Sequence, residues 1–142
     1  MKNLFLLLFF FYSTSVYSQI EKNTNWEIAK NKAELSNKNI LIILTGSDWC
    51  KPCIKMEKKV IHTPQFEEYA KNNLEIFEIN LPNHFDYSSE IIKEYEYFKN
   101  KYQSNALPSL ILVDKNGNEL GKVSKGVFSI EKVISTLENF KK

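Results

Sequence analysis

Residues 40–53 read ILIILTGSDWCKPC, and this stretch decides the fold. Its first five residues are an unbroken Ile/Leu run, which is typical of a short strand buried on both faces of a parallel or mixed sheet. Small and polar residues then end the strand, and Cys50 and Cys53 follow with two residues between them. A strand that leads through a loop into a helix is where α/β proteins place their chemistry.

The remaining sequence predicts helices and further strands around this one. Residues 24–38 have the pattern of an amphipathic helix, with Thr24 as N-cap and Glu27 completing a capping box. A helical pattern runs from Pro52 to about residue 61, and Pro64 interrupts it before a second helical stretch that ends near residue 70. Beyond it we expect a strand at 74–80, a helix at 88–102, a β-hairpin formed by 110–113 and 119–123, and a closing helix at 130–140. The fold class is therefore α/β, with a central four-stranded mixed sheet flanked by helices.

The first 18 residues have the pattern of a secretory signal peptide. Lys2 is followed by an apolar run of about nine residues, and small residues at Val16 and Ser18 precede an expected cleavage site. A helix that spans a bilayer needs about 20 apolar residues, so a removable signal is favoured over a permanent anchor. We expect residues 19–142 to form one domain that is exported, in the periplasm.

Charge and composition exclude several classes of protein. The chain has 142 residues with 43% hydrophobic and 25% charged residues, which is ordinary for one soluble domain and unlike a disordered chain. Its net charge is only +2, and the lysines are scattered among glutamates along the sequence. Binding to nucleic acid or to an acidic membrane therefore has no support from the sequence.

Cys50 and Cys53 are the candidate catalytic residues, and they are the only cysteines in the chain. At the start of a helix, unpaired amides and the helix dipole favour the thiolate, which is the attacking species in disulfide exchange. Cys50 is expected to attack a substrate disulfide and Cys53 to resolve the mixed disulfide. An inert structural bridge remains an alternative, although so short a loop stabilises weakly. Half of a zinc site is another, but His62 and His84 stand alone and no second cysteine pair exists, so we predict no metal.

Three neighbours of the cysteines are expected to adjust this chemistry. Lys51 adds a nearby cation that tunes Cys50 modestly, because water screens an exposed charge. Pro52 has a preset φ and no amide hydrogen, so it fits the first helical turn and stiffens the loop. Trp49 either shields the disulfide and presents a flat apolar surface to a substrate, or packs inside the protein.

Residues 45–53, TGSDWCKPC, resemble the active-site segment of the thioredoxin superfamily, in particular its exported bacterial thioredoxin-like branch. The resemblance extends from about Trp26 to the end of the chain. A second landmark is residues 106–112, ALPSLIL, which resemble the family's cis-proline segment beside the active site. The resemblance implies a cis bond between Leu107 and Pro108, with the Leu107 backbone pairing with substrate and Pro108 lying against the sulfurs. A proline at the first residue of a strand is the alternative reading of Pro108.

One position departs from the family pattern. Many thioredoxins carry a buried acid six residues before the first cysteine, where it assists proton transfer at the second cysteine, but this chain has Leu44 there. Water or another acid must then handle the proton of Cys53. Asp48 and Glu57 are the nearest acids in sequence, and we expect Asp48 in a loop or helix cap and Glu57 on a solvated helix face.

The resemblance and the intact cysteine pair together predict a thiol-disulfide oxidoreductase that acts on exported proteins, with reduction as the favoured direction. The cysteine pair itself replaces any cofactor, a membrane protein is a candidate electron donor, and we expect a monomer. The alternative is a non-catalytic binding module that holds a partner in the groove near Trp49 and Pro108. The sequence leaves the natural substrate and the electron donor open.

Overall fold

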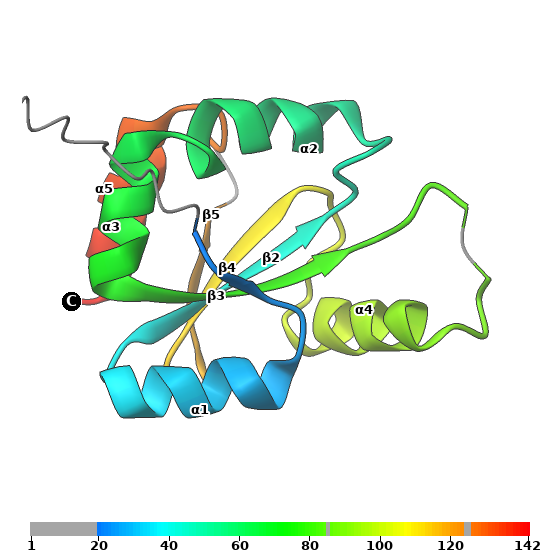
Figure 1. The fold of residues 1–142 in the computed structure, drawn as a ribbon, viewed down its shortest axis with the longest axis horizontal. Helices are drawn as coiled ribbons and strands as arrows, with labels where there is room; N and C mark the ends of the chain where they lie inside the picture. The colour runs from blue at the N-terminus through cyan, green and yellow to red at the C-terminus, as the bar shows by residue number, and fades with distance from the viewer. Residues whose placement is uncertain (1–19, 85, 124–125) are drawn as a thin grey trace, which may run out of the picture.

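Five strands form one mixed sheet at the centre of the molecule (Figure 1). The computed structural model describes residues 20–84, 86–123 and 126–142, and the predicted signal peptide lies outside them. The strands are β1 (Lys22–Asn23), β2 (Asn39–Thr45), β3 (Leu74–Asn80), β4 (Ser109–Val113) and β5 (Glu119–Val123), in the spatial order β1-β3-β2-β4-β5. β1, β3 and β2 are parallel, whereas β4 runs antiparallel to both of its neighbours.

The predicted count of four strands is wrong by one, because β1 adds an edge strand. β1 pairs with β3 through two residues only, Lys22 opposite Ile76 and Asn23 opposite Phe77. Two residues are too few to show the alternation that identifies a strand in a sequence. The four predicted strands are all present, and the hairpin of β4 and β5 is confirmed.

The central position of β2 explains its composition. This strand pairs with β3 on one side and with β4 on the other, and helices cover both of its faces. Residues 40–45 are completely buried. Each face of such a strand meets an apolar layer, so alternation with polar residues is lost and a continuous Ile/Leu run results.

Helices cover the two faces of the sheet in separate layers. Figure 1 shows α1 (Trp26–Ser36) and α4 (Glu90–Lys101) below the sheet, with α2 (Lys51–Met56), α3 (Pro64–Asn73) and α5 (Ile130–Phe140) above it. α2 continues directly into a π-helical turn, η1 (Glu57–Ile61). Each layer encloses its own cluster of buried apolar side chains. None of the helices in the described ranges is long and apolar enough to cross a membrane.

The start of α1 differs from the prediction. Asn25 caps the helix, since its side-chain oxygen accepts a hydrogen bond from the Ile28 amide at 3.1 Å. The expected capping box of Thr24 and Glu27 is therefore wrong by one residue. Both residue types cap helices well, so local sequence alone does not separate them. The helix ends at Ser36, two residues before the predicted end, and its C-cap Asn37 adopts a left-handed conformation with φ of 52°.

Candidate active site around Cys50 and Cys53

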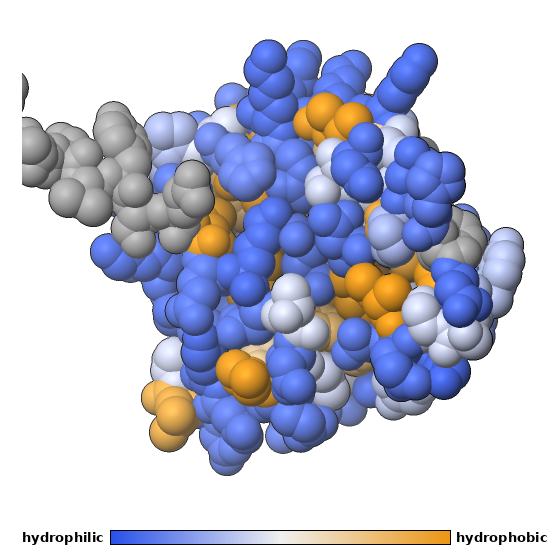
Figure 2. Space-filling view, turned by 45° about the vertical axis from the view of Figure 1, so that its right-hand side comes forward, coloured by the Kyte–Doolittle hydropathy of each residue, from blue (hydrophilic) through white to orange (hydrophobic). Residues whose placement is uncertain are grey.

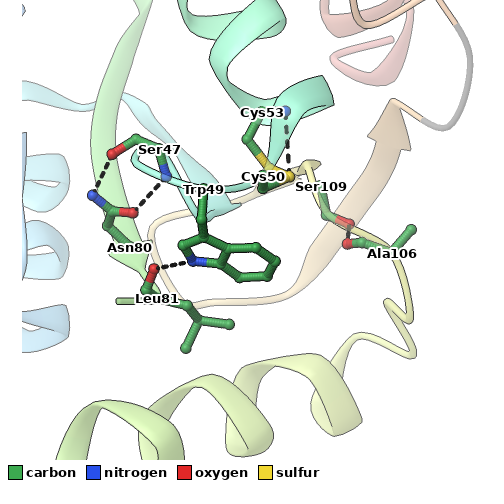
Figure 3. The surroundings of a disulfide bond; sticks show 8 residues. All are labelled: Ser47, Trp49, Cys50, Cys53, Asn80, Leu81, Ala106 and Ser109. Atoms are coloured by element: carbon green, nitrogen blue, oxygen red, sulfur yellow. Dashed lines mark hydrogen bonds between the residues drawn. A yellow bond between two sulfur atoms is a disulfide. The ribbon is translucent and has the colours of Figure 1, made fainter. Parts of the chain in front are cut away.

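Cys50 and Cys53 form a disulfide at the end of β2, where the chain turns into α2 (Figure 3). Cys50 is the N-cap of α2 and retains 6% of its accessible surface, whereas Cys53 lies inside the first turn and is fully buried. Cys50 is therefore the less buried of the two cysteines. Pro52 occupies the first helical turn as predicted, and both Pro52 and Lys51 are exposed.

The cap geometry provides a donor for a charged sulfur. The Cys53 amide donates a hydrogen bond to Cys50 Sγ over 3.3 Å. When the disulfide is opened, the same amide and the positive end of the helix dipole face a Cys50 thiolate. Hydrogen bonds and nearby positive potential favour the thiolate over the thiol. This arrangement suits nucleophilic attack by Cys50.

Trp49 is packed against the protein and also partly exposed. Its indole Nε1 donates to the Leu81 carbonyl over 2.8 Å, and Figure 3 shows the ring reaching from the disulfide loop to that residue. The ring also packs on Gly46, where an added Cβ would lie 2.7 Å from Trp49 Cε2. The side chain still exposes 37% of its surface beside the disulfide. Gly46 is thus required for the close approach of the indole, which the sequence analysis did not identify.

A second contact fixes the loop to the sheet. The Ser47 amide donates to Asn80 Oδ1 over 2.9 Å, and Asn80 Nδ2 donates to Ser47 Oγ over 2.6 Å (Figure 3). Asn80 ends β3, the strand next to β2. The sequence analysis missed this pair. Its only sequence signal is a polar residue at the end of a predicted strand, which is too common to be specific.

The bond between Leu107 and Pro108 is cis, which confirms the prediction. Both residues are half-buried and line a hollow beside the disulfide. Ser109 shapes this segment, because its hydroxyl donates to the Ala106 carbonyl over 2.5 Å and accepts from Ser104 over 2.7 Å. The hollow is bounded by residues of α2, the cis-proline loop, the start of β4, the end of β5 and the segment before α5, namely Pro52, residues 103–110, Lys122, Val123, Val127 and Phe128.

No acid occupies the place held by the buried carboxylate of many thioredoxins. Leu44 is completely buried in the apolar cluster that β2 shares with α1 and α4. Asp48 is exposed in the loop, as expected. Its side chain does not cap α2, because Cys50 holds that position.

The expectation of a solvated Glu57 is wrong. Glu57 is 6% exposed, and its carboxylate contacts Lys22 Nζ at 2.9 Å and His62 Nε2 at 3.0 Å. Lys22 also contacts Glu78 at 2.5 Å. The distant strand β1 supplies the lysine, so the sequence around Glu57 gave no sign of the pairing. Glu57 lies one turn after Cys53, and its second oxygen, Oε1, is buried and has no hydrogen-bond partner among the described residues.

This ionic group changes the titration of Lys22. Burial by itself lowers the pKa of an ammonium group, but the hydrogen bonds and charge attraction from Glu78 and Glu57 outweigh it. The pKa of Lys22 is therefore raised above its ordinary value of 10.5. The lysine stays charged at neutral pH and balances carboxylates on the disulfide side of the sheet.

The two histidines occupy different settings. His62 is exposed apart from its contact with Glu57, and His84 is exposed in the loop after β3. Within residues 20–84, 86–123 and 126–142, no group of three or more His, Cys, Asp or Glu side chains is arranged to hold a metal ion.

Known proteins similar to this chain share both its sequence pattern and its fold. The disulfide bond reductase DsbH of Chlamydia pneumoniae is 28% identical over 123 residues, which cover 82% of this chain and 74% of that protein. The thioredoxin-related protein DsbJ of the same organism is 26% identical over 99 residues, which cover 70% of this chain but only 28% of DsbJ. Among solved structures, a DsbH oxidoreductase superposes with a TM-score of 0.75 at 22% identity, over 87% of this chain and 85% of that one.

A thioredoxin from Thermus thermophilus superposes with a TM-score of 0.64 at 14% identity, covering 86% and 87% of the two chains, which supports the thioredoxin fold. The family model of the thioredoxin-like domain matches residues 26–141, nearly the whole described chain. The chain therefore belongs to the thioredoxin-like domain family, and it is a thiol-disulfide oxidoreductase.

Proposed function

We propose that this protein reduces disulfides of exported proteins through its Cys50–Cys53 pair. The observation that carries the proposal is the position of Cys50, which caps α2, accepts the Cys53 amide and is the less buried of the two cysteines. A disulfide needed only for stability has no use for a sulfur that caps a helix N-terminus. The two cysteines are the redox centre, and the proposed reaction uses no other cofactor.

The proposed reaction transfers two electrons to the substrate in two exchanges. In the reduced protein, the Cys50 thiolate attacks one sulfur of a substrate disulfide, forming a mixed disulfide and releasing the other sulfur as a thiolate that takes up a proton. Cys53 then loses its proton and attacks Cys50 Sγ. The Cys50–Cys53 disulfide forms, the second substrate sulfur leaves as a thiol, and a dithiol donor must reduce the protein for another cycle.

The proton released by Cys53 needs an acceptor, since Leu44 supplies none. We propose Glu57, because it follows Cys53 by one turn, is buried and has one carboxylate oxygen without a hydrogen-bond partner in the described ranges. Its contact with the exposed His62 offers a route for that proton to reach solvent. Asp48 is a weaker candidate because it lies in the exposed loop.

The substrate segment is proposed to lie along the cis-proline loop. Leu107 and Pro108 line the hollow beside the disulfide, and the half-exposed indole of Trp49 adds apolar surface nearby. In the thioredoxin family this is where an extended peptide pairs with the backbone before the cis proline. Pro52 lines the same hollow, and Lys51 precedes it in the chain. Both residues are proposed to tune the reactivity of Cys50.

Two observations favour reduction over oxidation. The relative from Chlamydia pneumoniae is itself named a disulfide bond reductase. Pro52 precedes the second cysteine, as in the reducing members of the superfamily.

The predicted signal peptide supports a location outside the cytoplasm, where a membrane protein is the proposed electron donor. We propose that the protein acts as a monomer.

Equilibration of the purified protein in redox buffers, followed by alkylation and mass measurement of its thiols, tests this direction. We expect a midpoint potential near or below about −220 mV, which suits a reductant fed by a donor. A midpoint above about −180 mV would instead assign oxidation or isomerisation. Reduction of insulin disulfides by the same preparation distinguishes the enzyme from a binding module, since a module does not accelerate that reaction.

A further inference from the structure

The helical segment of α2 and η1 presents a row of lysines to solvent. Lys51, Lys55, Lys58 and Lys59 are all exposed, whereas the one acid in this segment, Glu57, is buried. We refer to these four lysines as the basic row. In the sequence these lysines are interleaved with apolar residues and one glutamate. Because most of those other residues are buried, the surface of this segment is more basic than its amino-acid composition.

Helical geometry brings the basic row together on one face. Its members are separated by four, three and one positions, and residues three and four apart are neighbours on a helix surface. The opposite face carries the buried residues of the same segment, which are Cys53, Met56, Glu57, Val60 and Ile61. At 1.5 Å per residue the row extends about 12 Å along the helix. It starts at the residue directly after Cys50.

The lysines of the basic row have no acidic partner within the described part of the chain. None of the four has a described carboxylate oxygen within 4.0 Å, and Lys55 Nζ instead lies 4.7 Å from the centroid of the Phe128 ring. Other helices are built differently. α1, α4 and α5 each place a glutamate three residues before a lysine, in the pairs Glu27–Lys30, Glu90–Lys93, Glu96–Lys99 and Glu138–Lys141.

The surface over α2 agrees with this description. In Figure 2 the upper edge of the molecule, where Figure 1 places α2, is mostly hydrophilic and carries projecting hydrophilic side chains. Hydrophobic colour on this face is confined to separate patches. Charge, rather than a continuous apolar surface, is therefore the main property that this helix offers to a partner.

We propose that the basic row docks protein partners that carry an acidic surface beside their disulfide. The proposal rests on the proposed exchange at Cys50, because the row begins at the next residue and a partner sulfur at Cys50 necessarily lies beside it. Complementary charge raises the rate of encounter and orients the partner, and it contributes less to final affinity. Selection of partners by charge would thus appear in the rate constant of mixed-disulfide formation.

Three disulfide-bonded peptides of matched sequence provide the test, with three glutamates, three glutamines or three lysines flanking the disulfide. The reduced protein is mixed with each peptide, and second-order rate constants are measured at about 20 mM and about 300 mM salt. We expect the Glu peptide to react about tenfold faster than the Gln peptide at low salt, with most of this preference lost at high salt. The Lys peptide should be the slowest.

A triple variant assigns the preference to the basic row. K55Q/K58Q/K59Q should remove most of the preference for the Glu peptide while leaving the rate with the Gln peptide unchanged. K71Q/K115Q/K142Q makes the same change in charge at three exposed lysines, of which Lys71 and Lys115 lie near the strand ends opposite Cys50, and it should keep the preference. Circular dichroism of both variants checks that they are folded.

Other outcomes would overturn the proposal. Equal rates for the three peptides, or equal losses in the two triple variants, would show that the basic row does not select partners. If the preference were absent but the protein bound phosphatidylglycerol vesicles through the same lysines, the row would serve a membrane surface instead. Failure to reduce any peptide would contradict the proposed oxidoreductase reaction of Cys50, which is a different result from reduction without charge preference.

Discussion

The two faces of the sheet carry different kinds of side chain. Below the sheet, α1 and α4 enclose an aromatic cluster in which the rings of Trp26, Phe77 and Phe98 lie 5.0–5.3 Å apart between centroids. Above it, α2 and η1 carry the disulfide and Glu57, whose carboxylate meets Lys22. The buried charges and reactive sulfurs of the described chain therefore lie on one face, while the other provides apolar support.

Because of this difference, one face of the sheet contributes mainly to stability and the other carries the reactive cysteines. A reactive cysteine needs polar groups nearby, and a buried polar group is costly unless it has partners. An apolar face opposite the site can supply packing free energy without such groups. Mutations on the lower face should therefore change mainly the free energy of unfolding, and mutations at the disulfide mainly the exchange rate.

The largest expected effect is the loss of disulfide exchange when a cysteine on the upper face is replaced. Cys50→Ser should reduce disulfide exchange to the rate seen without protein, because the attacking thiolate is absent. Cys53→Ser should keep the attack but trap a mixed disulfide on Cys50, which mass spectrometry would detect. Full activity of Cys50→Ser would contradict the assigned roles. Each serine variant removes the crosslink, which by chain entropy costs at most about 2 kcal/mol of stability.

The second effect is on stability, at the lower face. Phe98 is 2% exposed and contacts four other aromatic rings. Phe98→Ala should lower the free energy of unfolding by about 4 kcal/mol, because it leaves a cavity in the aromatic cluster. Urea denaturation measures this change. The exchange rate per folded molecule should stay at the wild-type value, and a marked loss of that rate would show that the two faces are not separate.

A third test concerns the ionic group above the sheet. Lys22→Met leaves the buried carboxylate of Glu57 and the partly buried carboxylate of Glu78 without their shared cation, and it should cost about 2 kcal/mol at pH 7. This is below the loss typical of a fully buried pair, because Lys22 keeps 20% of its side-chain exposure. The variant Lys22→Met/Glu57→Gln should recover part of the loss, and no recovery would mean that charge is not the cause.

The loss of stability caused by Lys22→Met should depend on pH, and the raised pKa of Lys22 fixes the direction of that dependence. The pKa of Lys22 is raised in the folded protein, so its stabilising contribution is complete below the ordinary value of 10.5. It is lost as the pH rises through the higher folded-state value. The stability difference between wild type and Lys22→Met should therefore stay constant from pH 7 to about pH 10 and shrink above it. Denaturation curves at several alkaline pH values would measure this, and a difference that grew with pH would contradict the raised pKa.

The smallest expected losses of stability come from two helix caps, and they should be equal on the two faces of the sheet. Asn25 caps α1 on the lower side, and Thr63 caps α3 on the upper side by accepting the Phe66 amide at 3.3 Å. Asn25→Ala and Thr63→Ala should each cost about 1 kcal/mol, because a helix cap depends on local geometry rather than on the face. Thermal unfolding of the two variants makes the comparison. A loss confined to one variant would show that its cap has a tertiary role as well.

Much of the fold was predictable because its signals are local. The strand at 40–44, the strand at 74–80, the hairpin and the closing helix follow from runs or periods of apolar residues, and each is present within a residue or two. The cis bond before Pro108 followed from a family resemblance carried by a short motif. The missed β1 has only two residues, and its existence depends on the neighbouring edge of β3.

By itself, the sequence determined the thioredoxin-like fold, the cysteine pair and the absence of an acid at Leu44, since these depend on motifs and on residue identity at fixed positions. Only the tertiary structure decided that Glu57 is buried against Lys22, that Trp49 rests on Gly46, and that four exposed lysines lie in one row beside Cys50. The physical reason is distance along the chain: burial and charge pairing depend on which segments meet in space, and that information is not local to any residue.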